Sequence, residues 1–134
     1  DGAACNNRLD AFTEMRQAAL LSCAREQDAL ATSAAEALRL ATLDGARVLG
    51  LDDQIGTLEI GKRADITVVN ISRLHHAPGG DALSRLVYCA QSSDVRHVLV
   101  HGRVLVEGGE LRTLDEAEVI GDATLELKRL LART

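Results

Sequence analysis

Four histidines are the side chains of this sequence best suited to bind a metal ion or to carry a proton. His97 and His101 have the H-x-x-x-H spacing that, on a helix, places two imidazoles on one face and lets them share a metal. Here Val-Leu-Val separates them, which favours a strand, and four residues of strand span about 13 Å at roughly 3.3 Å per residue. We therefore expect surface or interface histidines at these positions and no shared metal.

The other two histidines are adjacent, in a segment that continues into Pro78-Gly79-Gly80. Adjacent side chains in extended backbone point to opposite sides of the chain. We therefore expect His75 and His76 to lie in an exposed loop and not to form a joint site.

The cysteines and the one Gly-Lys pair do not form known chemical motifs. Cys5, Cys23 and Cys89 are odd in number and make no C-x-x-C pattern, so neither a disulfide framework nor a zinc knuckle is predicted, and a reducing cytoplasm is expected. Cys23 and Cys89 are interpreted as core residues, and Cys5 stays undecided. Gly61-Lys62 lacks the G-x-x-x-x-G-K-[ST] spacing and precedes a strand, which excludes a phosphate-binding loop.

The composition is that of a soluble globular domain with few large side chains. Of the 134 residues, 46% are apolar and 26% are charged. The net charge of -5 argues against a nucleic-acid partner, and no apolar stretch approaches the roughly 20 residues that span a bilayer. Phe12 and Tyr88 are the only aromatic residues. We expect a core of Leu, Val, Ile and Ala that is completed by packing against other polypeptide.

The hydrophobic pattern predicts two helices, then strands, then a closing helix. Apolar residues recur at helical steps over 8–26, with Asn7 as the expected N-cap. Ser33 and Glu36 have capping-box spacing and open a second helix that reaches about Leu49. This order lacks the alternation of a complete doubly wound fold, and the architecture looks unfinished on its N-terminal side. The remaining expected elements are a strand at 64–71, a short helix at 82–90, a β-hairpin turning at His101-Gly102 and a helix at 114–132.

Four segments resemble the amidohydrolase superfamily. IGTLEIGKRADITVVN (55–70) is similar to its C-terminal signature, in which a Gly turn and a Lys/Arg-Ala-Asp step lead into a strand. ALRLATLDGARVLGLDDQIG (37–56) resembles the helix and connection before that signature, and DGAACNNRLDAFTEMRQAALL (1–21) the segment after the eighth barrel strand. LVYCAQSSDVRHVLVHGRVLVEGGEL (86–111) extends the likeness over nearly the whole chain. The most similar branch includes S-adenosylhomocysteine/5'-methylthioadenosine deaminases and triazine chlorohydrolases.

The resemblance implies an α+β fragment of a larger enzyme. Residues 1–53 would be C-terminal helices of a (β/α)8 TIM barrel, residues 54–111 strands of the accompanying small β-sandwich, and residues 112–134 a C-terminal helix. Ile60 stands where the family commonly has proline, and Asp44 where it has asparagine, and both are compatible with a turn and a helix. The family's H-x-H metal pair, its two later histidines and its glutamate base belong to segments N-terminal to this chain.

By resemblance, Asp1 is the aspartate at the C-terminal end of the last barrel strand, the face where barrel enzymes place their chemistry. The family role of this carboxylate is to bind a divalent metal, most commonly zinc, and to relay a proton from metal-activated water to the leaving nitrogen. Cys5, Asn6 and Asn7 would lie in the loop beside it as candidate substrate contacts. The implied reaction is deamination of a purine nucleoside or a related heterocycle.

Three hypotheses for the function stay open. The first is the C-terminal part of a metal-dependent aminohydrolase, inactive by itself because one ligand cannot hold the ion. The second is a chlorohydrolase or cyclic-amide hydrolase on the same scaffold, and the third is a non-catalytic helix and β-sandwich interaction module. For the enzymes, the expected partners are a small-molecule substrate and the missing N-terminal barrel. Unpaired strand edges and uncovered apolar faces also predict a homo-oligomer, and neither nucleic acid nor a membrane is an expected partner.

Overall fold

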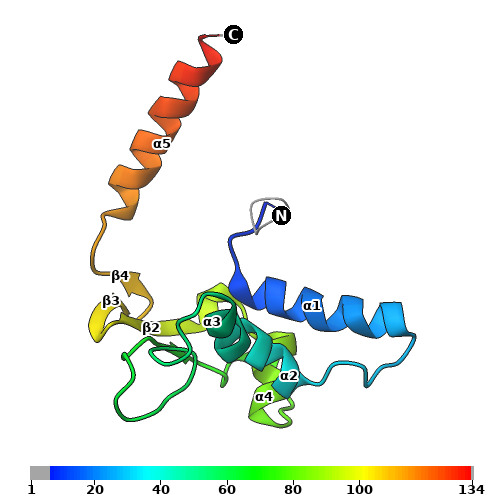
Figure 1. The fold of residues 1–134 in the computed structure, drawn as a ribbon. Coiled ribbons are helices and arrows are strands. Elements are labelled where there is room, and N and C mark those ends of the chain that lie inside the picture. Colours follow the sequence, from blue (N-terminus) through cyan, green and yellow to red (C-terminus); the bar gives the residue numbers. More distant parts are fainter. Residues whose placement is uncertain (1–6, 134) are drawn as a thin grey trace.

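A computed structural model describes residues 7–133. The chain is an α+β structure with a four-stranded antiparallel sheet, and short helical turns lie between the first two strands. The order of helices, strands and a closing helix is the one that the sequence predicts. Figure 1 shows α1 lying along the shorter helices, the small sheet beside them, and α5 projecting away from the rest. The elements are α1 (Ala11–Glu26), α2 (Ala34–Arg39), η2 (Leu40–Asp44), α3 (Gly45–Val48), β1 (Ile66–Val69), η3 (Leu74–His76), α4 (Ala82–Ser84), η4 (Arg85–Cys89), η5 (Ser92–Asp94), β2 (Val95–Val100), β3 (Arg103–Glu107), β4 (Glu110–Leu111) and α5 (Glu116–Leu131).

Helix α1 begins three residues later than the sequence suggests, and its N-cap is not the predicted one. Asp10 caps the helix: its carboxylate accepts hydrogen bonds from Phe12 N at 3.0 Å and from Thr13 Oγ1 at 3.1 Å. Asn7, the expected cap, lies in a turn with a φ of 58°. The prediction was wrong because a carboxylate at the start of a helix satisfies free amides and also opposes the positive end of the helix dipole.

The second helical run, α2–η2–α3, opens with the predicted capping box. Ser33 N donates to Glu36 Oε2 at 2.8 Å, and Glu36 N donates back to Ser33 Oγ at 3.3 Å. The connection that follows then crosses the run closely at Gly56, whose φ is +93°. A Cβ on Gly56 would lie 2.9 Å from both Leu43 Cα and Ala46 Cβ, so the close approach depends on glycine.

The core is small and joins α1, α2 and η4. Met15, Ala19, Ala37 and Val87 form the buried cluster, with Phe12, Ala34 and Leu38 packed against it. Cys23 and Cys89, predicted to be core residues, are only partly buried. Because these buried side chains are mostly small, the helices can approach closely, but they bury little apolar area.

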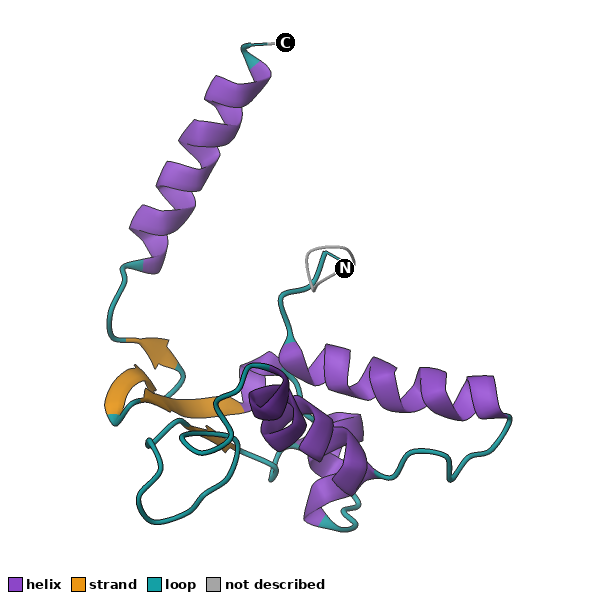
Figure 2. Ribbon diagram, viewed as in Figure 1, coloured by secondary structure: helices purple, strands orange, loops and turns teal. Residues whose placement is uncertain are grey.

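The sheet has the order β1-β2-β3-β4 with antiparallel neighbours. The predicted hairpin is confirmed: β2 and β3 turn at His101-Gly102, whose φ angles are 51° and 76°. A bulge interrupts the β2–β3 register between Val98 and Leu99. Figure 2 shows how short the strands are beside the helices, and how long the loop is that leads from α3 into β1.

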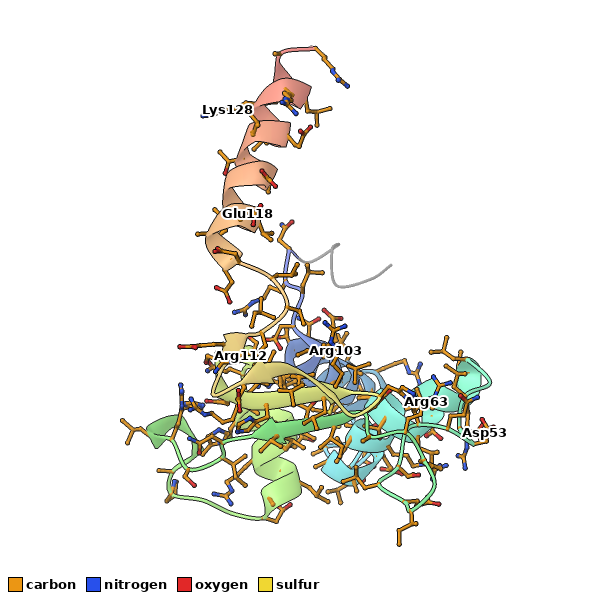
Figure 3. The ribbon with its side chains drawn as sticks, turned by 90° about the vertical axis from the view of Figure 1, so that its left-hand side faces the viewer. Asp53, Arg63, Arg103, Arg112, Glu118 and Lys128 are labelled. Carbon is orange, nitrogen blue, oxygen red and sulfur yellow. The ribbon has the colours of Figure 1, made fainter. Side chains whose placement is uncertain are left out.

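Helix α5 has no buried residue, although one of its faces is apolar. Val119, Ile120, Leu127 and Leu130 are each between 47% and 65% exposed. Figure 3 shows Glu118 and Lys128 along this helix, well away from the labelled Arg112 on the sheet. Across the described part of the chain, no helix combines the length and apolar character needed to cross a membrane.

Candidate functional site

Most of the predicted catalytic segment precedes the described residues. Asp1, Cys5 and Asn6 lie outside them, so their predicted roles stay predictions. Asn7, the remaining candidate for a substrate contact, is exposed in the turn that leads to α1. The structure therefore describes the element that follows this segment, which is α1.

Helix α1 is fixed to the rest of the molecule through Arg16. Its Nε donates to Val87 O at 3.3 Å, and its terminal Nη2 donates to Ala90 O at 2.7 Å. Both carbonyls belong to the C-terminal end of η4, where a cation is favourable because backbone oxygens are left without helical partners. These two hydrogen bonds fix the N-terminal half of α1 against η4, and the Asp10 cap stabilises its first turn. The predicted catalytic segment precedes this turn in the sequence.

An open apolar groove of about 610 Å³ lies between the N-terminal half of α1 and the α2–η2 run. Met15, Ala18 and Leu40 are among the residues that line it, and Asp10 and Glu14 contribute its carboxylates. The Asp10 carboxylate is occupied by the helix cap. The Asp10 carboxylate in this groove therefore stabilises the start of α1.

His75 and His76 form a joint cluster, contrary to the sequence interpretation. Both belong to η3, a short 3-10 turn, and their ring centroids are only 4.4 Å apart. Nε2 of His75 lies 2.8 Å from Asp94 Oδ2, and Nε2 of His76 lies 3.3 Å from the same oxygen. The prediction of opposite orientations was wrong because it assumed extended backbone, whereas a 3-10 turn can direct neighbouring rings to one side.

Asp94 is the centre of this cluster and is completely buried. Its Oδ2 also accepts a hydrogen bond from Gln91 N at 3.0 Å, and Arg73 Nε lies 3.4 Å from its Oδ1. Burial raises the pKa of this carboxyl, but hydrogen bonds from His75, from Gln91 N and from His76 hold the pKa below its usual value. Asp94 was not predicted from the sequence, since it lies 18 residues beyond His76 and no local spacing connects the two.

The cluster has a donor set that could serve two kinds of chemistry. Two imidazole nitrogens and one carboxylate oxygen converge within 4.8 Å of one another. Such groups can bind a divalent transition metal or pass a proton between them. His76 is buried together with Asp94, while the His75 side chain remains 34% exposed and links the cluster to solvent.

The other two histidines belong to the hairpin. His97 lies on β2 and is half-buried, opposite Glu107 of β3, and His101 is exposed in the turn. The backbone N of His101 donates to Asp65 Oδ1 at 2.6 Å. This backbone contact ties the hairpin turn to the segment that leads into β1.

The signature segment 55–70 uses its polar residues to hold backbone in place. Lys62 Nζ donates to Asp52 O at 2.7 Å and to Thr57 Oγ1 at 2.6 Å, which closes the long loop before β1. Asp65 binds the hairpin turn, and Gly102 N donates to Ala64 O at 3.0 Å. Lys62 and Asp65 therefore hold backbone in place in this arrangement.

Comparison with known proteins places this geometry in context. Residues 1–105 match the model of the amidohydrolase family. A 5-methylthioadenosine/S-adenosylhomocysteine deaminase of Thermoanaerobacter pseudethanolicus is 41% identical over 133 residues, which is 99% of this chain and 31% of that protein. The protein of the same name from Moorella thermoacetica is 44% identical over 129 residues, covering 96% of this chain and 30% of the relative.

Solved structures give the same result for the fold. A zinc-bound adenosine deaminase from Xanthomonas campestris matches with a TM-score of 0.94 and 42% identity, over 98% of this chain and 30% of its own. A zinc-bound atrazine chlorohydrolase from Arthrobacter aurescens matches with a TM-score of 0.76 and 30% identity, over 85% and 25%. The chain thus spans about 30% of the length of the curated relatives it matches. It belongs to the amidohydrolase family.

Proposed function

We propose that this chain is the C-terminal portion of a metal-dependent aminohydrolase that deaminates a purine nucleoside or a related heterocycle. The observation that carries the proposal is the match to a zinc-bound adenosine deaminase over 98% of the chain, with a TM-score of 0.94. The relatives named as deaminases support it with 41% and 44% identity. Because the chain spans about 30% of their length, we expect the remaining catalytic groups to come from further polypeptide.

In this proposal the chain contributes parts of two domains. Residues 1–53 supply C-terminal helices of a (β/α)8 barrel, residues 54–111 supply strands of a small β-sandwich, and residues 112–134 form a closing helix. The partly buried helices and the short, open-edged sheet support this division, since each leaves apolar surface for a neighbouring layer. We propose the missing barrel as the principal partner, within a cytoplasmic homo-oligomer.

The proposed catalytic residue of this chain is Asp1. A divalent metal, most simply zinc, would supply activation of a water molecule when bound. The Asp1 carboxylate would help to hold that metal and would carry a proton from the attacking water to the exocyclic nitrogen. The water oxygen would bond to the ring carbon as the carbon–nitrogen bond breaks and ammonia leaves. Cys5, Asn6 and Asn7 follow in the same loop and are the proposed substrate contacts. Arg16 anchors α1, the helix that follows these residues, through its hydrogen bonds to Val87 O and Ala90 O.

The test compares the intact protein containing these residues with its Asp1→Asn variant. Ammonia release is measured from adenosine, 5'-methylthioadenosine and S-adenosylhomocysteine, and chloride release from a chlorotriazine. We expect ammonia release by the wild-type protein and a loss of about 10³-fold or more in kcat for Asp1→Asn, because the proton relay is removed. Asp122→Asn, on the exposed α5 helix, is the matched control and should keep the wild-type rate.

The outcomes separate the alternatives. Chloride release without ammonia release would favour a chlorohydrolase, a function that the similarity to an atrazine chlorohydrolase supports. An Asp1→Asn variant with the wild-type rate would remove Asp1 from the mechanism. If the intact protein releases neither ammonia nor chloride, the non-catalytic module would be favoured. The 134-residue chain by itself is expected to release no ammonia even with added zinc.

A further inference from the structure

We infer that His75, His76 and Asp94 bind a divalent transition metal of the Zn²⁺ class. Two imidazole nitrogens and a carboxylate are the ligands that such ions take in proteins, and three of them leave a position for water. The sequence interpretation treated this segment as an exposed loop, and the proposed aminohydrolase mechanism does not use it. The inference therefore goes beyond the proposed function.

The ligand atoms are already gathered around one point. Nε2 of His75 and Nε2 of His76 lie 2.8 Å and 3.3 Å from Asp94 Oδ2, and all three atoms lie within 4.8 Å of one another. Ligand bonds to zinc of about 2.0–2.2 Å place neighbouring ligand atoms about 3.3 Å apart in a tetrahedral site. The His76 and Asp94 atoms have this separation. A rotation of His75, whose side chain is 34% exposed, completes the set.

The second observation is a buried oxygen without a hydrogen bond. Among the described residues, Asp94 Oδ1 has no hydrogen-bond partner although its side chain is fully buried. A buried carboxylate oxygen without a hydrogen bond is costly unless a cation lies near it, and the cation near Oδ1 is the partly exposed Arg73, whose Nε is 3.4 Å away. Gln91 N already donates to Oδ2 and fixes the orientation of the carboxylate at 3.0 Å, which is the support that a metal ligand requires.

Arg73 is the group that competes with the metal. Its Nε lies 3.4 Å from Asp94 Oδ1, and its side chain is 42% exposed, so it can move into solvent when a cation arrives. In the metal-free cluster the two Nε2 atoms share the Asp94 carboxylate through hydrogen bonds. Binding therefore replaces these hydrogen bonds with bonds from the two Nε2 atoms to the metal.

The test measures bound zinc in the intact protein that contains these residues. Wild-type protein and the variants His75→Asn, His76→Asn and Asp94→Asn are dialysed against buffered zinc, and zinc per chain is measured by mass spectrometry. We expect each variant to hold one zinc fewer than the wild-type protein. His97→Asn and His101→Asn, which change the hairpin histidines, are the matched controls and should hold the wild-type amount.

One further variant separates metal binding from a purely structural role. Arg73→Gln removes the competing cation, so it should bind zinc more tightly than the wild-type protein in a competition with a chelator. A cluster that exists only to hold the fold would give equal zinc content in all variants and no gain for Arg73→Gln, and that result would overturn the inference. His75→Asn guards against misfolding because its side chain is partly exposed. Its melting temperature should rise less than that of the wild-type protein when zinc is added, because only one of the two proposed zinc sites remains.

Discussion

Two glycines with nearly the same positive φ allow the packing of the long loop to be tested apart from the strain of that φ. Gly56 has a φ of +93° and Gly61 a φ of +98°. A Cβ on Gly56 would lie 2.9 Å from Leu43 Cα and Ala46 Cβ, whereas a Cβ on Gly61 would meet nothing within 4 Å. Substitution by alanine therefore adds the same conformational strain at both positions but a steric clash only at Gly56.

The magnitudes follow from these contacts. Positive φ is unfavourable for alanine by about 1–2 kcal/mol, and forcing extra volume into packed structure adds about 1–3 kcal/mol. We expect Gly61→Ala to lower the free energy of unfolding by about 1–2 kcal/mol and Gly56→Ala by about 2–5 kcal/mol. The clash involves a backbone carbon of η2, so it cannot be relieved by a side-chain rotation.

The measurement is urea unfolding of the intact protein, followed by far-UV circular dichroism. The two midpoints are compared at equal slope, so that the difference reports stability and not a change in compactness. Gly56→Ala should have the lower midpoint. Equal midpoints for the two variants would refute the reasoning, because they would show that the loop does not rest on η2 and α3.

Three other predictions test the helical layer. Arg16→Ala should lower the free energy of unfolding by about 2–3 kcal/mol in urea melts, because two carbonyls lose a charged donor. The control is Arg25→Ala, which removes an exposed ion pair on the same helix. It should change the free energy of unfolding by less than about 0.5 kcal/mol. Hydrogen bonds from Ser33 hold the pKa of Glu36 below its usual value of 4.5. The capping box therefore stabilises the fold above pH 4.5, and this stabilisation is lost as the pH falls through the lower pKa of the folded state. An NMR titration should show that Ser33→Ala raises the pKa of Glu36, and an unchanged pKa would contradict the capping role. In sedimentation the isolated chain should associate, since one face of α5 leaves its apolar residues exposed, and a cooperatively melting monomer would contradict this.

Local patterns predicted the elements of this chain better than their ends. The α1 helix and the β2–β3 hairpin follow from apolar spacing and from a turn with glycine, both of which are properties of a few neighbouring residues. The cap of α1 was assigned to Asn7 instead of Asp10, because both types can cap and the choice depends on where the helix meets the core. The four-residue strand β1 is shorter than the predicted 64–71, and its last pair with β2, Val69 with Val95, follows a bulge between Val68 and Val69.

The His75, His76 and Asp94 cluster could not be predicted from sequence spacing. The two rings face one side because the chain makes a 3-10 turn there, in which His76 N donates to Arg73 O and Ala77 N donates to Leu74 O. Asp94 meets them because β1 and β2 pair, so that the residue before β2 is brought next to the loop after β1. By contrast, the family was identified from the signature at 55–70, whose order of residue types is local.

The way in which Lys62 and Asp65 are used has a consequence for classification. Lys62 stabilises the long loop by hydrogen bonds within it, and Asp65 accepts a hydrogen bond from the turn of the hairpin. When the polar groups of a segment form only intramolecular hydrogen bonds, the segment can stay the same in proteins that catalyse different reactions. The signature therefore groups proteins by how this segment is built, and it does not by itself specify a substrate.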